Sequence, residues 1–451
     1  MMKNKICYIL AFITLAFFAV IFIQGKAHIF KPKELNGVYY TPKAPVCTFK
    51  NYCDGSMQKS INDYLRYNFG FREVFIRFYN QYIWDFYKKS LNKTIIIGKD
   101  NWLYGSNDVE NYHESAMYNY TSDRNEMAKK LSLEASRMYK VQKILKEYGI
   151  FLFMTIEPGK SFVFPEFLPE NDKYKRKPFH AIEFYRQAFD SLNVNYIDLN
   201  QWFINQKGKT KYPLFPKSGL HWSHVASVYA FDTIVKYIEH ENDMNLNNYS
   251  VVGIHPCEPE KPDDDIEKLL NLMRPIKGNV YYKAETEFTE DPTAVFPKYL
   301  VVGDSYNWNI LKSVPIGGIF EKSPYWYYNS SLFHHEKYKS LDEFDYLDEI
   351  LRYKIINLAY SPAQLFVFSN GFLPKTLLFL CHDDEEIDSV ANEIAKTIDN
   401  ISDEEKLKNA RKTLFSEPEK YFNDLSTNDI PVKRNKRIKA IMKKYYDIEI
   451  D

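Results

Sequence analysis

The spacing of hydrophobic positions changes several times along the chain, and each change predicts an element. Residues 6–23 form an uncharged apolar run about long enough to span a bilayer. Helical periodicity follows at 59–90 and is interrupted at Gly70, which predicts two helices with a bend. Farther on, short apolar runs alternate with amphipathic stretches. The predicted strands are 94–97, 150–156, 194–199, 299–302, 354–358 and 376–380.

This alternation predicts an α/β fold with a mainly parallel sheet flanked by helices. One helix is predicted at 123–148, with Gly149 at its left-handed stop, and another begins after Ser223 as the N-cap. Few apolar positions mark an insertion at about 258–298. The expected organisation is a signal anchor at 1–28, a stalk and helical segment at 29–92, the α/β domain at 93–382 and a charged helical tail at 383–451.

The N-terminal run predicts a single-pass membrane anchor. Lys3 and Lys5 precede it, which favours a cytoplasmic N-terminus with the remainder outside. Residues 24–26 are a poor cleavage site, so an uncleaved signal anchor is favoured over a cleaved signal peptide. Cys47 and Cys53 could form a local disulfide in an oxidising compartment or remain two thiols.

Composition removes some classes of function. The chain has 59 Lys and Arg against 59 Asp and Glu, so a nucleic-acid partner has no electrostatic footprint. The sequence contains no CxxC pair, HExxH motif or P-loop, and we expect neither a metal nor another cofactor. Aromatic residues make up 17% of the chain. Most of these rings must pack in the core, but the excess also suits a sugar-binding surface.

A serine and a histidine carry the candidate chemistry. Ser305 follows a predicted strand, where α/β sheets bind ligands and where backbone N–H groups can hold an oxyanion. Gly303 would permit the turn and Asp304 belongs to it. His221 stands on a predicted loop edge and could accept the proton of the serine. Alternatively, Ser305 and Asp304 cap a helix and His221 is a packing residue.

Other residues are weaker candidates. Lys160 follows a strand and could face the same edge of the sheet as Ser305, or it is a solvated lysine in a plain turn. Residues 98–104 form a strand end and tight turn, or a hairpin packed on the core. His224 competes with His221 but is expected at the surface or at a helix cap. The candidate sugar platforms are Trp102, Tyr104, Trp222 and Tyr306.

Five motifs in register resemble the alginate O-acetyltransferase-like proteins, which are similar in fold to SGNH hydrolases. The motifs are 68–73, 97–104, 157–160, 221–222 and 303–306, and the resemblance spans roughly residues 60–370. It implies that Ser305 is the nucleophile and His221 the base. The family's aspartate stands two positions before this histidine, where the chain has Gly219. The alternatives for orienting His221 are Ser218, a backbone carbonyl and a distant acid such as Asp198.

The resemblance also implies a biological setting. Members of that family work in the periplasm, often on an N-terminal anchor, and acetylate an exported polysaccharide. A membrane-bound O-acyltransferase supplies their acetyl groups. The expectation is therefore a polysaccharide O-acetyltransferase that needs no cofactor. Two alternatives remain open: an acetyl esterase on the same fold, and a weakened or inactive protein that binds or assembles polysaccharide.

Overall fold

The computed structural model describes residues 2–37, 41–113, 115–170, 180–321, 324–334, 337–341, 344–399, 401–427 and 436–446. The chain divides into two compact units, and each is built from segments that are separate in sequence. The first unit comprises Met1–Gly105, Lys217–Gly219 and Asp264–Asn279, and the second Ser106–Pro216, Leu220–Asp263 and Val280–Asp451. This division differs from the linear boundaries expected from the sequence, because part of the insertion joins the N-terminal unit and the tail joins the sheet.

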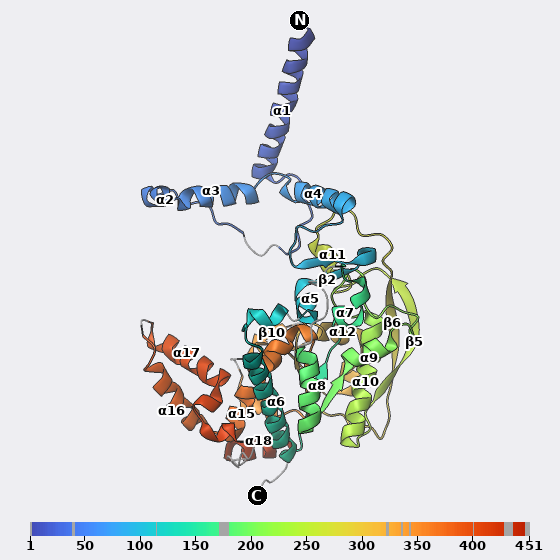
Figure 1. Ribbon diagram of the computed structural model, residues 1–451, viewed down its shortest axis with the longest axis vertical. Helices are drawn as coiled ribbons and strands as arrows, with labels where there is room; N and C mark the ends of the chain where they lie inside the picture. Colours follow the sequence, from blue (N-terminus) through green and yellow to red (C-terminus); the bar gives the residue numbers. More distant parts are fainter. Residues whose placement is uncertain are drawn as a thin grey trace. The chain divides into compact units, whose positions relative to one another are not determined.

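The first unit begins with an apolar helix, α1 (Met2–Ala27), whose last 23 residues are long and apolar enough to cross a membrane. Two amphipathic helices follow, α3 (Ser56–Tyr67) and α4 (Arg72–Tyr87), as the periodicity predicts. They lie across the carboxyl end of α1 (Figure 1). A Cβ atom on Gly70, between α3 and α4, would lie only 2.0 Å from the carbonyl oxygen of Ile21. Glycine therefore permits this close approach of the chain to α1.

The first unit is completed by short elements. Strands β1 (Ile95–Ile97) and β2 (Leu103–Gly105) pair antiparallel, so residues 98–104 form the hairpin that was one of the two alternatives. Cys47 and Cys53 are separate thiols. The remaining helices of this unit are α2 (Phe49–Cys53), α11 (Asp265–Leu269) and the 3-10 turn η1 (Lys99–Asn101).

The second unit contains a seven-stranded sheet in the order β10-β9-β8-β7-β11-β3-β4. The five strands from β8 to β4 run parallel, and β9 and β10 add an antiparallel edge. The prediction of a mainly parallel sheet is therefore confirmed. The strands are β3 (Phe151–Ile156), β4 (Tyr196–Asp198), β7 (Tyr299–Gly303), β8 (Tyr325–Tyr327), β9 (Ser331–His334), β10 (Lys337–Ser340) and β11 (Ile355–Tyr360).

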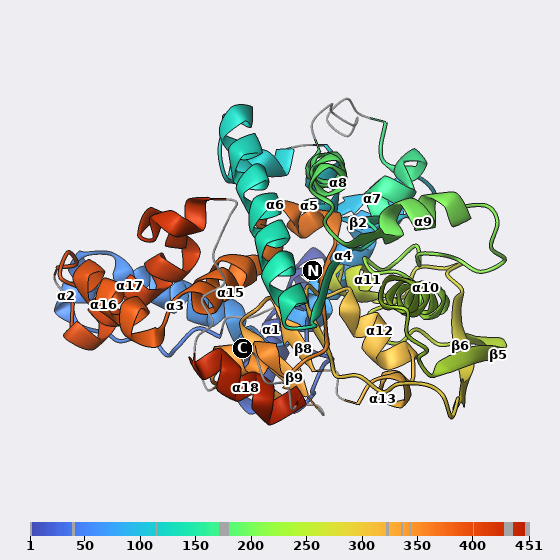
Figure 2. The same ribbon diagram turned by 90° about the horizontal axis from the view of Figure 1, so that it is seen from below.

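Helices cover both faces of this sheet (Figure 2). Alternate strand residues such as Leu152, Leu300 and Leu358 share a core with α6 (Arg124–Glu147), α8 (Ala181–Leu192) and α15 (Phe372–Cys381). On the other face, the ring of Phe153 packs against Tyr237 of α10 (His224–Asn242). The predicted helix ends are confirmed: Gly149 has a φ of +68°, and Ser223 accepts a hydrogen bond from the backbone of Ala226.

One expectation for this unit is wrong. Residues 376–380 belong to helix α15 and not to a strand, because a short apolar run alone does not distinguish a buried helix from a buried strand. The segment Pro362–Cys381 is also long and apolar enough to cross a membrane, but 61% of its apolar window is buried in the structure, as in a core helix. Within the predicted insertion, β6 (Tyr281–Thr289) pairs with β5 (Asn248–Cys257) in a separate sheet.

The remaining elements of the second unit are short. The α-helices are α5 (Ser106–Tyr112), α7 (Lys160–Val163), α9 (Leu199–Gln206), α12 (Asn307–Ser313), α13 (Ile316–Ile319) and α14 (Tyr346–Leu351). The 3-10 segments include η2 (Ser115–Asn119), η3 (Pro165–Phe167), η6 (Pro362–Gly371), η7 (Pro418–Lys420) and η8 (Asn423–Ser426).

The C-terminal tail is helical, as predicted, and belongs to the core of the second unit. Its helices are α16 (Asp384–Ala395), α17 (Asp403–Ser416) and α18 (Lys436–Tyr446). Apolar side chains of the tail, including Leu414, Ile438 and Met442, join the same cluster as the strands. The tail is thus an integral layer of this unit.

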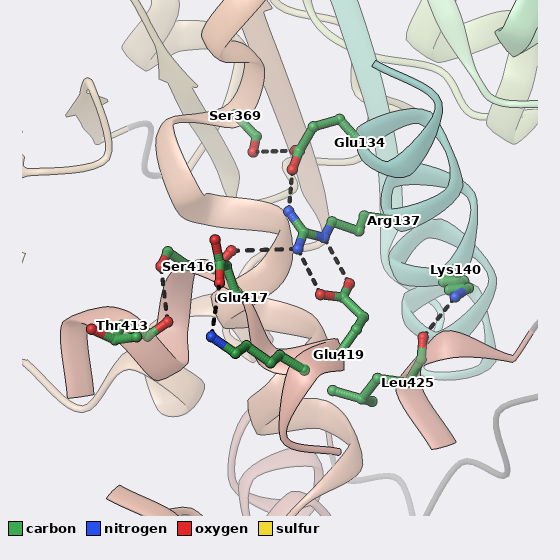
Figure 3. Close-up of polar contacts among 10 residues, drawn as sticks. Glu134, Arg137, Lys140, Ser369, Thr413, Ser416, Glu417, Glu419 and Leu425 are labelled. Carbon is green, nitrogen blue, oxygen red and sulfur yellow. Dashed lines mark hydrogen bonds and ion pairs between the residues drawn. The ribbon is translucent and has the colours of Figure 1, made fainter. Parts of the chain in front are cut away.

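A buried ionic network joins the tail to α6 (Figure 3). Arg137 donates to both carboxylate oxygens of Glu419, at 2.7 and 2.6 Å, and also binds Glu134. Glu134 in turn accepts a hydrogen bond from Ser369. One turn along the helix, Lys140 donates to the carbonyl oxygen of Leu425 at 2.7 Å. The attraction within such a pair offsets the cost of removing its charges from water, and removal of one partner leaves the other charge buried and unpaired.

Candidate active site

Polar residues follow each of four adjacent parallel strands at the carboxyl edge of the sheet. In the spatial order β8, β7, β11 and β3, these residues are Tyr328, Asp304 with Ser305, Ser361 and Glu157. The carboxyl ends of parallel strands meet at one edge, where open α/β sheets bind their ligands. Segments far apart in sequence therefore contribute to one polar site.

Ser305 and His221 meet at this edge. The Oγ of Ser305 lies 2.9 Å from the Nε2 of His221, which is within hydrogen-bond distance. The distance falls in the range that a general base needs to take up a proton. His221 is mostly buried, whereas Ser305 keeps part of its surface exposed. The structure thus brings together the two residues that the sequence offered as nucleophile and base.

Several hydrogen bonds fix the loop that carries His221 against the chain after Ser305. The hydroxyl of Tyr306 donates to the carbonyl oxygen of Leu220, and the indole of Trp222 donates to the carbonyl oxygen of Tyr306. Asn309 on α12 donates to the carbonyl oxygen of Trp222 at 2.7 Å. The rings of His221 and Tyr306 are 4.7 Å apart between centroids. The two halves of the site are therefore held by contacts besides their own hydrogen bond.

Asp304 organises the turn that carries Ser305. One carboxylate oxygen accepts the N–H of Tyr306, and the other accepts both the N–H and the hydroxyl of Ser361, at 2.9 and 2.6 Å. Gly303 is required for a reason other than the expected turn. A Cβ at this position would lie 2.2 Å from the carbonyl oxygen of Ala359 on the neighbouring strand. The glycine allows β11 to approach and is not needed for a left-handed conformation.

Glu157 is a buried acid beneath this turn. Its side chain is fully buried, and burial raises the pKa of its carboxyl well above the ordinary value, with the negative charge of Asp304 adding to the shift. Glu157 is therefore neutral at the pH at which an ordinary glutamate is ionised. A protonated acid beside Asp304 avoids the repulsion that two buried carboxylates would produce.

Tyr328, the residue after the neighbouring strand β8, contacts Ser305. Its backbone N–H donates to the carbonyl oxygen of Gly303, and its φ of +48° turns the chain at the end of β8. Burial raises the pKa of the Tyr328 hydroxyl, and this effect is larger than the lowering that its hydrogen bond with Ser305 produces. Sequence reasoning missed Tyr328 and Ser361. The strand-end rule would have selected both, once the order of strands was known.

Lys160 lies at the carboxyl end of β3, but it is not solvated. Its side chain is fully buried, and its Nζ donates to the carbonyl oxygen of Pro216 at 2.8 Å. Close by, Asp108 accepts the N–H of Ser161, and burial raises the pKa of Asp108 to about 6. A lysine held in this way stabilises the loop after β3 and has no exposed amine for a substrate.

The proposed sugar platforms are core residues. Trp222 and Tyr306 are buried in the second unit, and Trp102 and Tyr104 are buried in the hairpin of the first unit. A ring needs an exposed face to stack on a sugar, so none of the four is retained as a platform. Their aromatic area instead stabilises the scaffold.

The third member of the triad is the point at which the site departs from the family pattern. Gly219 has no carboxylate, and the Nε2 of His221 faces Ser305, so an orienting acceptor must serve Nδ1. Both oxygens of Asp198 are committed elsewhere, one to the N–H of Gln201 and the other to Arg186 at 2.5 Å. Asp198 is therefore held at the start of α9, and the acceptor for Nδ1 remains Ser218, a backbone carbonyl or another distant acid.

His224 is not an alternative base. It is the first residue of α10, and its Nδ1 accepts the backbone N–H of Ala284 at 3.3 Å. Burial lowers the pKa of His224, which keeps its ring neutral. Among the described residues, no group of three or more His, Cys, Asp or Glu side chains is arranged to hold a metal ion.

Residues 95–307 match a family model described as the SGNH hydrolase-like domain of the acetyltransferase AlgX. The chain carries an SGNH hydrolase-like domain. The matched segment includes both His221 and Ser305, and the resemblance inferred from the sequence motifs is confirmed. No curated protein matches the chain.

Solved structures resemble the chain at low sequence identity. The O-acetyltransferase domain of Pseudomonas putida AlgJ is 14% identical, with a TM-score of 0.42 and coverage of 62% of this chain and 98% of that one. Pseudomonas aeruginosa AlgX is 14% identical, with a TM-score of 0.38 and coverage of 62% and 66%. Bacillus cereus PatB1, solved with a sulfonyl adduct, is 13% identical, with a TM-score of 0.36 and coverage of 55% and 94%.

Proposed function

We propose that the protein transfers acetyl groups to hydroxyls of an exported polysaccharide through Ser305 and His221. The observation that carries this proposal is the 2.9 Å separation of Ser305 Oγ and His221 Nε2 at the carboxyl edge of the sheet. The match of residues 95–307 to an acetyltransferase domain supports the choice of acyl group. The N-terminal apolar helix α1 supports a membrane-anchored protein whose second unit works outside the membrane, in the periplasm.

The chemistry follows from the geometry of the pair. The Oγ of Ser305 attacks the carbonyl carbon of an acetyl donor while His221 Nε2 takes its proton. The tetrahedral intermediate collapses, the donor's leaving group receives that proton, and an acetyl-serine remains. A sugar hydroxyl then attacks the acetyl carbon and gives its proton to His221. Breakdown of the second intermediate returns the proton to Ser305 and releases the acetylated sugar.

Two groups support the nucleophile in this scheme. Backbone N–H groups at the turn after β7 would hold the oxyanion, as they do where strands lead into helices. The hydroxyl of Tyr328 lies beside Ser305 and would donate to the acyl oxygen. The acetyl source would be a membrane-bound O-acyltransferase, as in the proteins that the sequence resembles.

Gly219 is the observation that favours a second candidate, a polysaccharide-binding protein that keeps the fold without turnover. Loss of an orienting aspartate lowers the rate of serine triads by about 10⁴-fold. The arrangement around Tyr306 and Asn309 supports the enzyme instead, because these two side chains hold the histidine loop by bonds that do not depend on position 219. Hydrolysis is the third outcome, since water and a sugar hydroxyl differ only as acceptors.

The test is acetyl turnover by the full chain in detergent, measured for wild type, Ser305→Ala and His221→Ala. Release of the leaving group from an acetyl ester reports the first half-reaction. The mass of an added oligosaccharide reports whether the acetyl group is transferred or lost to water. We expect turnover in wild type alone and an acetylated acceptor. Folded wild-type protein that binds glycan but shows no turnover would favour the binding role.

A further inference from the structure

We infer that helix α4 is a membrane-surface helix whose aromatic face lies in the outer interface of the bilayer that α1 crosses. The inference rests on the proposed anchoring of the chain by α1 and is independent of the chemistry at Ser305. It assigns a partner, the lipid surface, to a part of the first unit that the proposed reaction does not use.

One side of α4 is aromatic and exposed. Phe75, Phe78, Tyr79, Tyr82 and Phe86 recur at helical spacing and fall on one stripe of the helix. Phe86 is 73% exposed and Phe78 is 65% exposed. A contiguous exposed stripe of this kind indicates an interaction surface and not an ordinary scatter of surface rings.

The opposite side of α4 is already occupied by its own unit. Arg77 donates to the carbonyl oxygen of Leu272, and Asn80 donates to that of Leu270. Gln81 accepts the N–H groups of Met273 and Arg274. These contacts fix the rotation of the helix about its axis, so the aromatic stripe is turned away from the segment 264–279.

Contacts with α1 show on which side the stripe lies. Phe75, the first residue of the stripe, packs edge-on against Phe17, with their ring centroids 6.4 Å apart. Phe17 belongs to the apolar run of α1. This run ends before Gln24, whose side chain forms hydrogen bonds with the backbone of Phe30. The carbonyl of Ile21, near this limit, is in close approach with Gly70. The stripe therefore continues the apolar surface of α1 at the depth where the run ends.

A groove between α3 and α4 is lined by side chains that could bind a phospholipid. It has a volume of about 490 Å³ and is lined by Leu65, Arg66, Phe69, Arg72, Phe75 and Ile76. Its two guanidinium groups stand beside apolar and aromatic side chains, as a phosphate headgroup above an acyl chain requires. Amphipathic helices with aromatic residues on one face and basic residues nearby lie in the plane of the interface. Tyrosine is also enriched at the headgroup level.

The consequence is that the chain is attached to the bilayer at two places, because α1 crosses the bilayer and α4 lies on its surface.

The test uses the full chain reconstituted in vesicles of phosphatidylethanolamine and phosphatidylglycerol. A spin-labelled keto-phenylalanine replaces Tyr82, Phe86, Phe12 or Tyr229, one at a time, so that the native cysteines stay in place. Phe12 is an exposed residue of α1, and Tyr229 is an exposed ring on α10 of the second unit.

Collisions with oxygen, which partitions into lipid, are compared with collisions with a water-soluble nickel complex. We expect the oxygen-to-nickel ratio at positions 82 and 86 to exceed that at position 229 several-fold and to remain below that at position 12. A nickel accessibility at 82 and 86 equal to that at 229, with position 12 in lipid, would overturn the inference and leave the anchor intact. Low accessibility to both reagents at 82 and 86 would also overturn it, because a second protein copy would then cover the stripe. An aqueous label at position 12 would refute the anchor itself.

Discussion

The hydroxyl of Tyr306 donates a hydrogen bond to the carbonyl oxygen of Leu220 at 3.0 Å, so the residue after Ser305 holds the residue before His221. The bond links two loops that are 86 residues apart in sequence. In a triad, the aspartate restrains the histidine from its far side. Here the restraint acts on the backbone of the histidine loop, and it is available although position 219 lacks an acid.

Replacing Tyr306 with phenylalanine should weaken that restraint while keeping the ring. A buried hydrogen bond contributes about 1 kcal/mol, which corresponds to roughly a fivefold change in rate if it is felt in the transition state. We expect kcat for acetyl release to fall by about that factor, with little change in KM. Tyr229→Phe, on the exposed surface of α10, is the matched control and should keep full activity. Equal activity of both variants would show that His221 is held by other contacts.

The Tyr328→Phe variant tests the hydroxyl beside Ser305. If that hydroxyl donates to the acyl oxygen as charge develops, its loss should lower kcat by about 10- to 100-fold, somewhat less than removal of a dedicated oxyanion donor. The backbone bond from Tyr328 to Gly303 does not involve the side chain, so the melting temperature should change little. A loss of stability without a loss of kcat would place Tyr328 in the scaffold.

The raised pKa of Glu157 makes a prediction about stability and pH. In the unfolded chain this carboxyl ionises near 4.5, whereas in the folded protein it keeps its proton to a higher pH. The folded state therefore binds the extra proton between these two values, and stability decreases as pH rises through that window. Glu157→Gln carries no such proton. Thermal melts should show the stability of the variant rising relative to that of wild type as pH increases above the unfolded-state pKa, by about 1.4 kcal/mol for each pH unit until the folded carboxyl ionises.

If the difference in stability between wild type and Glu157→Gln did not change with pH, the carboxyl of Glu157 would be ionised in the folded protein. Asp108 does not confuse the comparison, because its own titration at about 6 is common to both proteins. The melt also separates this effect from catalysis, since it needs no substrate.

Arg137→Met should destabilise the protein strongly. The change leaves the carboxylates of Glu134 and Glu419 buried without their partner, and such a loss costs about 3–5 kcal/mol. Arg411→Met removes the exposed ion pair with Asp388 and should cost less than about 1 kcal/mol. Urea denaturation measures both. Adding Glu419→Gln to Arg137→Met should recover part of the loss, and no recovery would argue against buried charge as the cause.

The elements that could be predicted from the sequence are those with a local signal. The strands β3, β7 and β11 are continuous apolar runs bounded by turn residues, and their predicted limits are within two residues of the observed ones. The helix ends at Gly149 and Ser223 are also local signals, because glycine adopts the left-handed stop and serine caps the first turn. The strand β8 was missed, because Tyr325–Tyr327 is too short to show a period.

The site divides in the same way. Ser305 and His221 were selected by motif, but their separation of 2.9 Å depends on how the strands are ordered. Ser361 and Tyr328 have no motif, and they join the site only because β11 and β8 lie on either side of β7. The burial of Trp222, Tyr306 and Lys160 also depends on tertiary packing. Aromatic composition alone therefore suggested a sugar-binding surface, whereas Trp222 and Tyr306 are buried in the core.

The tail also bears on the timing of folding. Ile438 and Met442 of α18 pack in the same cluster as Leu152 of β3, so the core on this face of the sheet is completed by a segment that is made after all of the strands. Synthesis delivers a chain from its N-terminus. The core on this face therefore stays incomplete until α18 has been made, although α6, α8 and α15 precede it in the chain. During that interval the unfinished sheet is exposed to aggregation, and a holding chaperone on the side of the membrane where it folds would have its greatest effect there.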